Sequence, residues 1–133
     1  MNANDGMNYA PRTKPKPVCA KGNFRGAAIG LDHGHINGMC GGLEDAGADI
    51  VAVYDPDPAK IDEFRETFPT AQIASSEREV LEDDSIQLVA SAAITSQRGP
   101  LGLRVLDYGK HYFSDKAPFT TLQQLADARE KVA

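Results

Sequence analysis

The spacing of apolar and polar residues changes abruptly near residue 24. From there to the end of the chain, short apolar runs typical of buried strands alternate with segments whose apolar residues recur every three or four positions, which indicates helices. The expected strands lie at 25–30, 49–55, 72–74, 86–94 and 111–114. The expected helices lie at 34–47, 58–68, 76–81, 100–108 and 121–133, with Asp57, Ser76 and Thr121 as their clearest N-caps.

Strand and helix therefore alternate five times, with connections of a few residues. This pattern predicts one α/β domain of three layers: a doubly wound, mostly parallel sheet of Rossmann-like type, with helices on both faces. The domain should span residues 24–133. Residues 1–23 are polar and rich in proline without periodicity, and we expect them to form a flexible leader.

The composition is typical of a soluble globular protein, with 41% hydrophobic residues, 25% charged residues and a formal net charge of −5. An acidic body disfavours nucleic acid or an anionic membrane as the main partner. No apolar run approaches the ~20 residues of a membrane span, and no secretory signal is evident. Because Cys19 and Cys40 are too few for a disulfide framework, we expect a cytoplasmic protein.

In a doubly wound sheet, ligands bind beyond the carboxyl ends of the strands, where the strand order reverses. The first strand–helix turn reads Gly30-Leu31-Asp32-His33-Gly34-His35-Ile36 and keeps only the first glycine of a G-x-G-x-x-G dinucleotide turn. Its place after the first strand nevertheless predicts a dinucleotide whose pyrophosphate faces the helix N-terminus. The expected binding residues in this turn are Gly30, Asp32, His33, Gly34, His35 and Ile36.

Asp55 ends the second strand, 25 residues after Gly30. An acid there can accept both ribose hydroxyls and would repel a 2′-phosphate, which favours NAD over NADP. Alternatively, Asp55 caps the turn formed with Pro56, Asp57 and Pro58.

The Asp32 carboxylate would repel the pyrophosphate unless His33, His35 or a cation neutralised it; alternatively, it caps the helix that follows. Two histidines at i and i+2 without a third ligand nearby are a weak metal signal, and no metal site is predicted.

The ordered set of three segments resembles the N-terminal domain of the Gfo/Idh/MocA oxidoreductases. The segments are the 27–30 strand and turn, the 51–58 strand and turn, and Asp115-Lys116-Ala117-Pro118 before the helix opened by Thr120-Thr121. The resemblance covers about residues 24–133. It implies an NAD(P)-dependent oxidoreductase that transfers a hydride between the dinucleotide and a sugar, polyol or related hydroxy compound.

The same resemblance assigns residue roles. Lys116 matches the lysine of the family's Glu-Lys-Pro motif, with Asp in place of Glu and an inserted alanine, and is the expected catalytic residue. The family's Thr-Pro-Asn-x-x-His loop near the nicotinamide corresponds to residues 93–98, which retain none of its named residues. Thr95 could still bind the cofactor, and Arg98 could meet an anionic substrate or lie in solvent.

Family enzymes continue into a substrate domain that this sequence does not contain. We therefore expect part of a longer enzyme, which would take its small hydroxylated substrate with a second domain and could form homo-oligomers through exposed edges. The alternative is a non-catalytic nucleotide-binding or protein-interaction module of the same fold. A receiver-type domain is disfavoured because no acid follows the 88–90 segment before Asp107.

Overall fold

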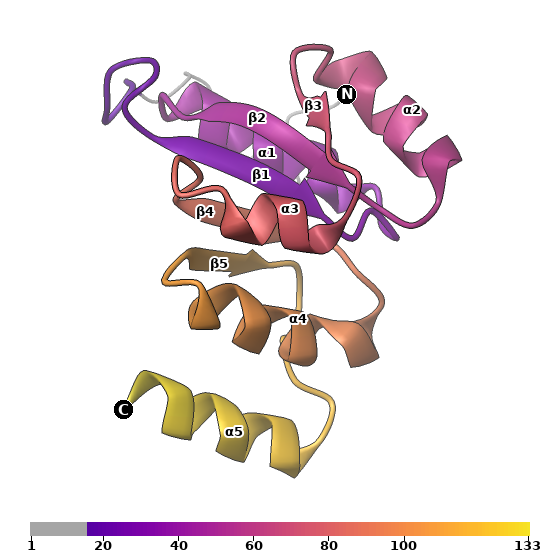
Figure 1. Cartoon of the computed structure of the whole chain (residues 1–133), viewed down its shortest axis with the longest axis vertical. Coiled ribbons are helices and arrows are strands. Elements are labelled where there is room, and N and C mark those ends of the chain that lie inside the picture. The colour runs from indigo at the N-terminus through magenta and orange to yellow at the C-terminus, as the bar shows by residue number, and fades with distance from the viewer. Residues whose placement is uncertain (1–15) are drawn as a thin grey trace, which may run out of the picture.

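A computed structural model describes residues 16–133, in which strands and helices alternate along the chain (Figure 1). The strands are β1 (Arg25–Ile29), β2 (Asp49–Tyr54), β3 (Gln72–Ile73), β4 (Leu88–Ser91) and β5 (His111–Ser114). The helices are α1 (His35–Asp45), α2 (Pro58–Thr67), α3 (Glu77–Glu82), α4 (Thr95–Asp107) and α5 (Leu122–Val132).

All the strand pairs are parallel, and the sheet has the order β3-β2-β1-β4-β5. The chain builds outward from β1 to β3, then crosses back and builds outward from β4 to β5. The strand order therefore reverses between β1 and β4, which is where a doubly wound sheet binds its ligands. The predicted fold class is confirmed.

The two faces of the sheet bury separate cores. Ala28 of β1 packs with residues of α1 and α2, including Ile36 and Phe64, whereas Ala27 and Ile29 pack on the opposite face with residues of α3 and α4. Burial on both faces explains why the strands form continuous apolar runs rather than alternating ones. α4 lies between β5 and α5, which packs on the outside of α4 (Figure 1).

The predicted N-caps of α2, α3 and α5 are confirmed. The side chains of Asp57, Ser76 and Thr121 accept from the backbone N–H groups of Ala59, Glu79 and Gln124. Each cap gives a partner to one of the amide groups that a helix N-terminus leaves free.

The predicted boundaries around α4 were wrong. α4 begins at Thr95 rather than Pro100, and β4 ends at Ser91 rather than continuing to residue 94. Proline inside a helix removes one backbone hydrogen bond, which would leave the Ser96 carbonyl without its usual partner. Gln124 Nε2 of α5 donates to that carbonyl over 3.2 Å. A hydrogen bond from a distant helix thus supplies the partner that Pro100 removes inside α4, although the sequence around Pro100 favours a helix start there.

Residues 1–15 of the predicted leader lie outside the described residues. Residues 16–23 form no helix or strand, and Val18 N–H donates to the Ala46 carbonyl beyond α1 over 2.8 Å. Within residues 16–133, no helix combines the length and apolar character that crossing a membrane requires.

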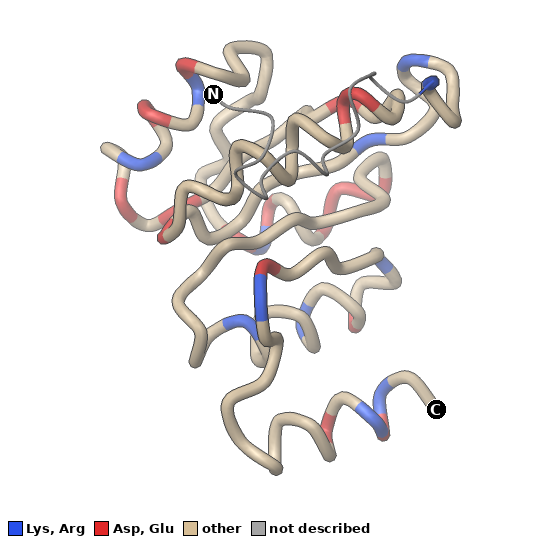
Figure 2. The backbone as a smooth tube through the Cα atoms, turned by 180° about the vertical axis from the view of Figure 1, so that it is seen from behind, with Lys and Arg blue, Asp and Glu red and all other residues tan. Residues whose placement is uncertain are grey.

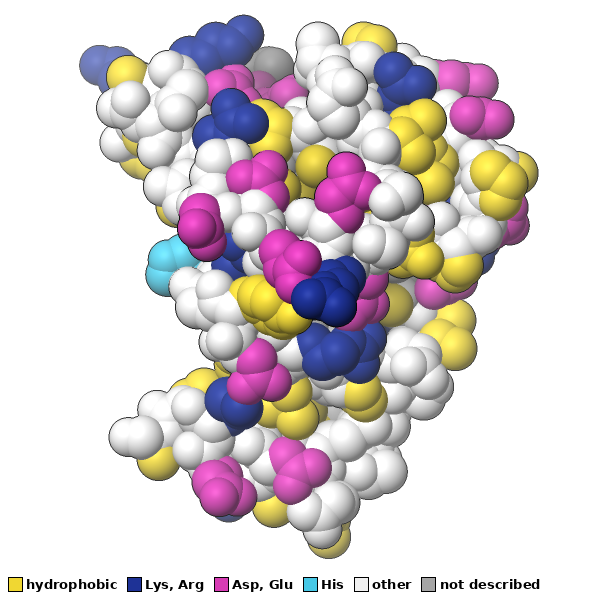
Figure 3. Space-filling model, in the orientation of Figure 1, with side chains coloured by type: hydrophobic (Ala, Val, Ile, Leu, Met, Phe, Trp, Pro, Cys, Tyr) yellow, Lys and Arg dark blue, Asp and Glu magenta, His cyan; other side chains and the backbone are white. Residues whose placement is uncertain are grey.

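Acidic and basic residues occur together along α2 and α5 (Figure 2) and are intermixed on the face shown in Figure 3.

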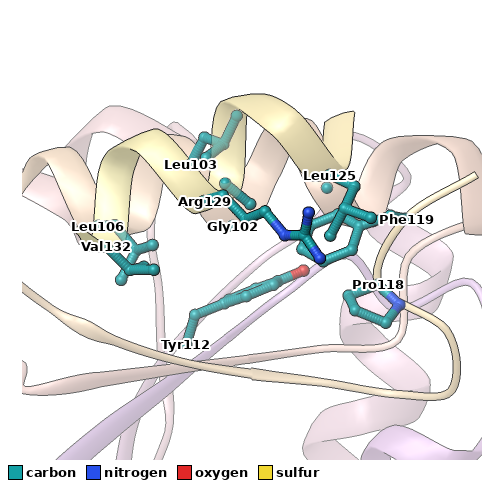
Figure 4. Close-up of a pocket in the computed structure, with 11 residues that line it drawn as sticks. Gly102, Leu103, Leu106, Tyr112, Pro118, Phe119, Leu125, Arg129 and Val132 are labelled. Carbon is teal, nitrogen blue, oxygen red and sulfur yellow. The ribbon is translucent and has the colours of Figure 1, made fainter. Parts of the chain in front are cut away.

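The contact between α4 and β5 gives a test of the packing. Gly102 of α4 lies against the Tyr112 ring (Figure 4), and a Cβ at Gly102 would lie 2.6 Å from two ring carbons. Tyr112 cannot easily move aside, because its hydroxyl donates to the Arg98 carbonyl over 2.9 Å. We expect Gly102→Ala to lower the free energy of unfolding by about 1–3 kcal/mol in urea denaturation, through overpacking.

Gly41→Ala is the matched control. Gly41 lies inside α1, and a Cβ there would have no neighbour within 4 Å. This substitution should raise the free energy of unfolding by about 0.5–1 kcal/mol, because alanine loses less backbone freedom in a helix. Equal effects at the two glycines would contradict the packing described for α4.

Candidate functional site

The turn between β1 and α1 begins at Gly30, where the backbone must be glycine. Its φ is +77°, and a Cβ would lie 2.8 Å from the Cβ of Ala93, which follows β4. Gly30 N–H donates to the Tyr54 carbonyl over 3.2 Å, and its carbonyl accepts from Ala92 N–H over 3.0 Å. Gly30 therefore brings the ends of β1, β2 and β4 together.

Asp55 fixes this turn from the end of β2. Its side chain is 4% exposed. Oδ2 accepts from Leu31 N–H over 2.8 Å, and Oδ1 accepts from Asp57 N–H over 2.9 Å. The carboxylate thus caps the turn after β2, as the alternative prediction had it. It also binds the β1–α1 turn through Leu31. Binding of a ribose by the remaining lone pairs stays a prediction.

Asp32 connects three elements rather than capping α1. The N-cap of α1 is Gly34, without a side-chain hydrogen bond. Asp32 Oδ1 lies 2.6 Å from Lys60 Nζ of α2, and Oδ2 accepts from Ile94 N–H over 3.0 Å. The hydrogen bond from Lys60 lowers the pKa of Asp32. Lys60, rather than either histidine, supplies the neutralising charge that the sequence required.

Two backbone amides of the turn face away from the protein's own acceptors. The N–H groups of Asp32 and Gly34 have no hydrogen-bond partner among the described residues. A hollow of about 280 Å³ adjoins them, lined partly by Asp32, Gly34 and Lys60. Free amides at the start of an 11-residue helix are suited to phosphate oxygens. Ile36 does not join them, because its side chain is buried in the core and its N–H donates to the His33 carbonyl.

His35 contacts Asp115, a residue 80 positions away that the sequence did not place beside it. His35 Nδ1 lies 3.1 Å from Oδ1 of Asp115, which follows β5 and is 9% exposed. Arg98 of α4 is 6% exposed; its guanidinium lies 3.6 Å from Asp115 Oδ2, and its Nε donates to the Ala93 carbonyl. Arg98 is therefore held inside the structure and not presented to an anionic substrate.

Lys116 follows Asp115 directly, and its side chain is exposed. It is the one residue other than glycine with a positive φ among the described residues, at +51°. Such backbone costs about 1 kcal/mol or more and tends to mark functional positions. Thr95 is the first residue of α4 and is also exposed. Within residues 16–133, neither side chain makes a hydrogen bond or ion pair that tests its predicted role.

A second hollow lies away from these residues. An apolar cavity of about 240 Å³ lies between α4, β5 and α5, lined partly by Tyr112, Phe119, Leu125 and Val132 (Figure 4). None of the predicted site residues lines it. The predicted site residues lie instead in the β1–α1 turn and after the ends of β2, β4 and β5.

The double contact of Asp55 can be tested by its stability effect. Asp55→Ala leaves two backbone N–H groups without their partner, and we expect the free energy of unfolding at pH 7 to fall by about 2–4 kcal/mol. Asp57→Ala, which removes only the N-cap of α2, should cost about 1 kcal/mol. Urea denaturation measures both. A loss at Asp55 no larger than that at Asp57 would show that the carboxylate does not hold the turn.

Comparison with known proteins gives matches over this same region. The family model described as the oxidoreductase family, NAD-binding Rossmann fold, matches residues 26–133. Among solved structures, a putative oxidoreductase from Erwinia carotovora atroseptica is 43% identical, with a TM-score of 0.79 over 82% of this chain and 33% of that one. No curated protein matches the chain.

Two more distant structures share the fold. The myo-inositol dehydrogenase from Lactobacillus casei, in complex with NAD(H) and myo-inositol, is 23% identical with a TM-score of 0.72, over 81% of this chain and 32% of that one. A 3-ketoreductase from Actinomadura kijaniata, in complex with NADP, is 22% identical with a TM-score of 0.68, over 81% of this chain and 36% of that one. The chain thus spans about a third of the length of these proteins. It belongs to the Gfo/Idh/MocA oxidoreductase family, of which it contains the NAD-binding Rossmann domain.

Proposed function

We propose that this chain binds NAD(H) for an oxidoreductase that transfers a hydride between the cofactor and a sugar, polyol or related hydroxy compound. The observation that carries the proposal is the β1–α1 turn, which lies where the strand order reverses. Two of its N–H groups have no partner within residues 16–133 and lie beside an open hollow. The inositol dehydrogenase among the similar structures supports the substrate class.

The residues of the turn suit a dinucleotide. The Asp32 and Gly34 amides would hold the pyrophosphate, helped by the positive end of the α1 dipole. A Cβ at Gly34 would have no neighbour within 4 Å, so a ligand has room to approach the backbone there. When bound, the nicotinamide supplies the hydride chemistry. The protein's part is to position it at the ends of β4 and β5, near Thr95.

NAD is the preferred cofactor in this proposal. Asp55 and Asp57 place two carboxylates just beyond β2, where a ribose would lie and where a 2′-phosphate would be repelled. Lys60 is the nearby cation that could bind a 2′-phosphate, but it is paired with Asp32. Similar structures include both NAD(H) and NADP complexes, so this preference has to be measured on this chain.

Lys116 is the proposed catalytic residue. It lies two residues after β5, where this proposal puts the nicotinamide, and its exposed side chain and positive φ support a functional role. There its side chain would orient the substrate hydroxyl. As a neutral amine it would accept the hydroxyl proton when the hydride leaves for NAD⁺, and as an ammonium group it would return that proton in the reverse reaction. A second domain would complete the substrate-binding site.

Titration calorimetry of the chain with NAD⁺, NADH and NADP⁺ tests the cofactor proposal. We expect saturable binding of NAD⁺ and NADH, with NADP⁺ weaker. Asp32→Ala should tighten NAD⁺ binding about fivefold, because it removes a negative charge beside the pyrophosphate and frees Lys60.

Asp62→Ala is the matched control, since it removes an exposed acid of the same helix as Lys60 that does not line the hollow. Its affinity for NAD⁺ should equal that of the unmodified chain. No binding of any dinucleotide at millimolar concentration would reject the proposal and favour a non-catalytic module of the same fold. Weaker binding by Asp32→Ala would contradict the expected electrostatic gain and would mean that the contacts of Asp32 with Lys60 and Ile94 are needed to hold the turn for the ligand.

A further inference from the structure

His33, His35 and Asp115 form a compact cluster of possible metal ligands. One ligand atom from each residue lies within 4.8 Å of the other two. The two histidines flank Gly34 in the β1–α1 turn, and Asp115 follows β5, so the fold joins positions 80 residues apart in the sequence. Both imidazoles are exposed, so an ion could reach them from solvent.

The carboxylate of this cluster is held in place from inside the protein. Arg98 lies 3.6 Å from Asp115 Oδ2 and is itself anchored by the Ala93 carbonyl over 2.7 Å. His35 Nδ1 lies 3.1 and 3.2 Å from the two oxygens of Asp115. His33 Nδ1 accepts from His35 N–H over 3.1 Å, and the two ring centroids are 3.9 Å apart. His35 and Asp115 are thus positioned before any ligand binds, and His33 lies beside them.

The spacing of these groups suits a small transition-metal ion. Nitrogen and oxygen ligands about 2.0–2.2 Å from a tetrahedral zinc ion lie about 3.3 Å from each other. The separation between His35 Nδ1 and Asp115 Oδ1, 3.1 Å, is close to that value. His33 must approach by a further 1–2 Å or so, which an exposed imidazole beside glycine can do by rotation about its side-chain bonds.

The donor types narrow the choice of ion. Two imidazoles and one carboxylate are typical of zinc and related transition metals, whereas magnesium and calcium prefer oxygen ligands. Arg98 offsets the charge of Asp115, which should make the site weaker than a closed structural zinc site. Three protein ligands leave at least one coordination position open toward solvent.

We propose that His33, His35 and Asp115 form a binding site for a divalent transition-metal ion of the zinc class. The ion replaces the hydrogen bond between His35 and Asp115. The proposal concerns the chain without a dinucleotide and is independent of the proposed function.

Calorimetric titration of the full chain, without an affinity tag and in a buffer that does not chelate metals, tests the site with ZnCl₂. We expect saturable binding of one Zn²⁺ per chain. His33→Gln and His35→Gln should each weaken binding at least tenfold, because each removes a direct ligand. His111→Gln is the matched control: it removes the remaining histidine, exposed at the start of β5, and should leave the affinity unchanged.

Cys19→Ser controls for zinc binding by a thiol and should also leave the affinity unchanged. Thermal unfolding without metal checks that each variant is folded; because both histidine side chains are exposed, their replacement should not disturb the core. The absence of saturable binding would overturn the proposal. So would equal losses at His35 and His111, or a loss of affinity in Cys19→Ser.

Discussion

The two hydrogen bonds accepted by the Asp55 carboxylate are the central constraint on the β1–α1 turn. The carboxylate joins the first residues after β1 to the first residues after β2, through the N–H groups of Leu31 and Asp57. Because Leu31 is buried, loss of the carboxylate would leave its N–H without an acceptor and destabilise the turn. Together with the contacts of Gly30 and Asp32, this hydrogen bond holds the turn that leads into α1.

This constraint changes how the acid at the end of β2 is understood. From the sequence, ribose binding and turn capping were alternatives for Asp55. The structure shows that the carboxylate already accepts two backbone hydrogen bonds, and a carboxylate has about four acceptor positions. A ribose contact would therefore be added to the structural role, not exchanged for it. Loss of cofactor binding on substitution of Asp55 would consequently mix damage to the turn with loss of a direct contact.

The sequence predicted the fold well because both faces of the sheet are buried, which makes each strand a continuous apolar run. The N-caps were also local signals, visible in Asp57, Ser76 and Thr121. The errors arose where distant contacts decide the outcome. Pro100 lies within α4, and the Ser96 carbonyl that it leaves without a helical partner accepts from Gln124 of α5. The pairing of His35 with Asp115 could not be predicted from the sequence, because it requires the strand order.

The residues around the β1–α1 turn form two parts with different chemistry, one on the β2 side and one on the β5 side. On the β2 side, Asp32 and Lys60 neutralise each other across the end of α1, and the acids that follow β2 give this part a negative character. On the β5 side, Arg98 neutralises Asp115, and exposed imidazoles and Lys116 remain. Under the proposed function, the ribose of the dinucleotide would lie in the first part, where the carboxylates would serve recognition. The nicotinamide would lie in the second part, near the exposed amine of Lys116.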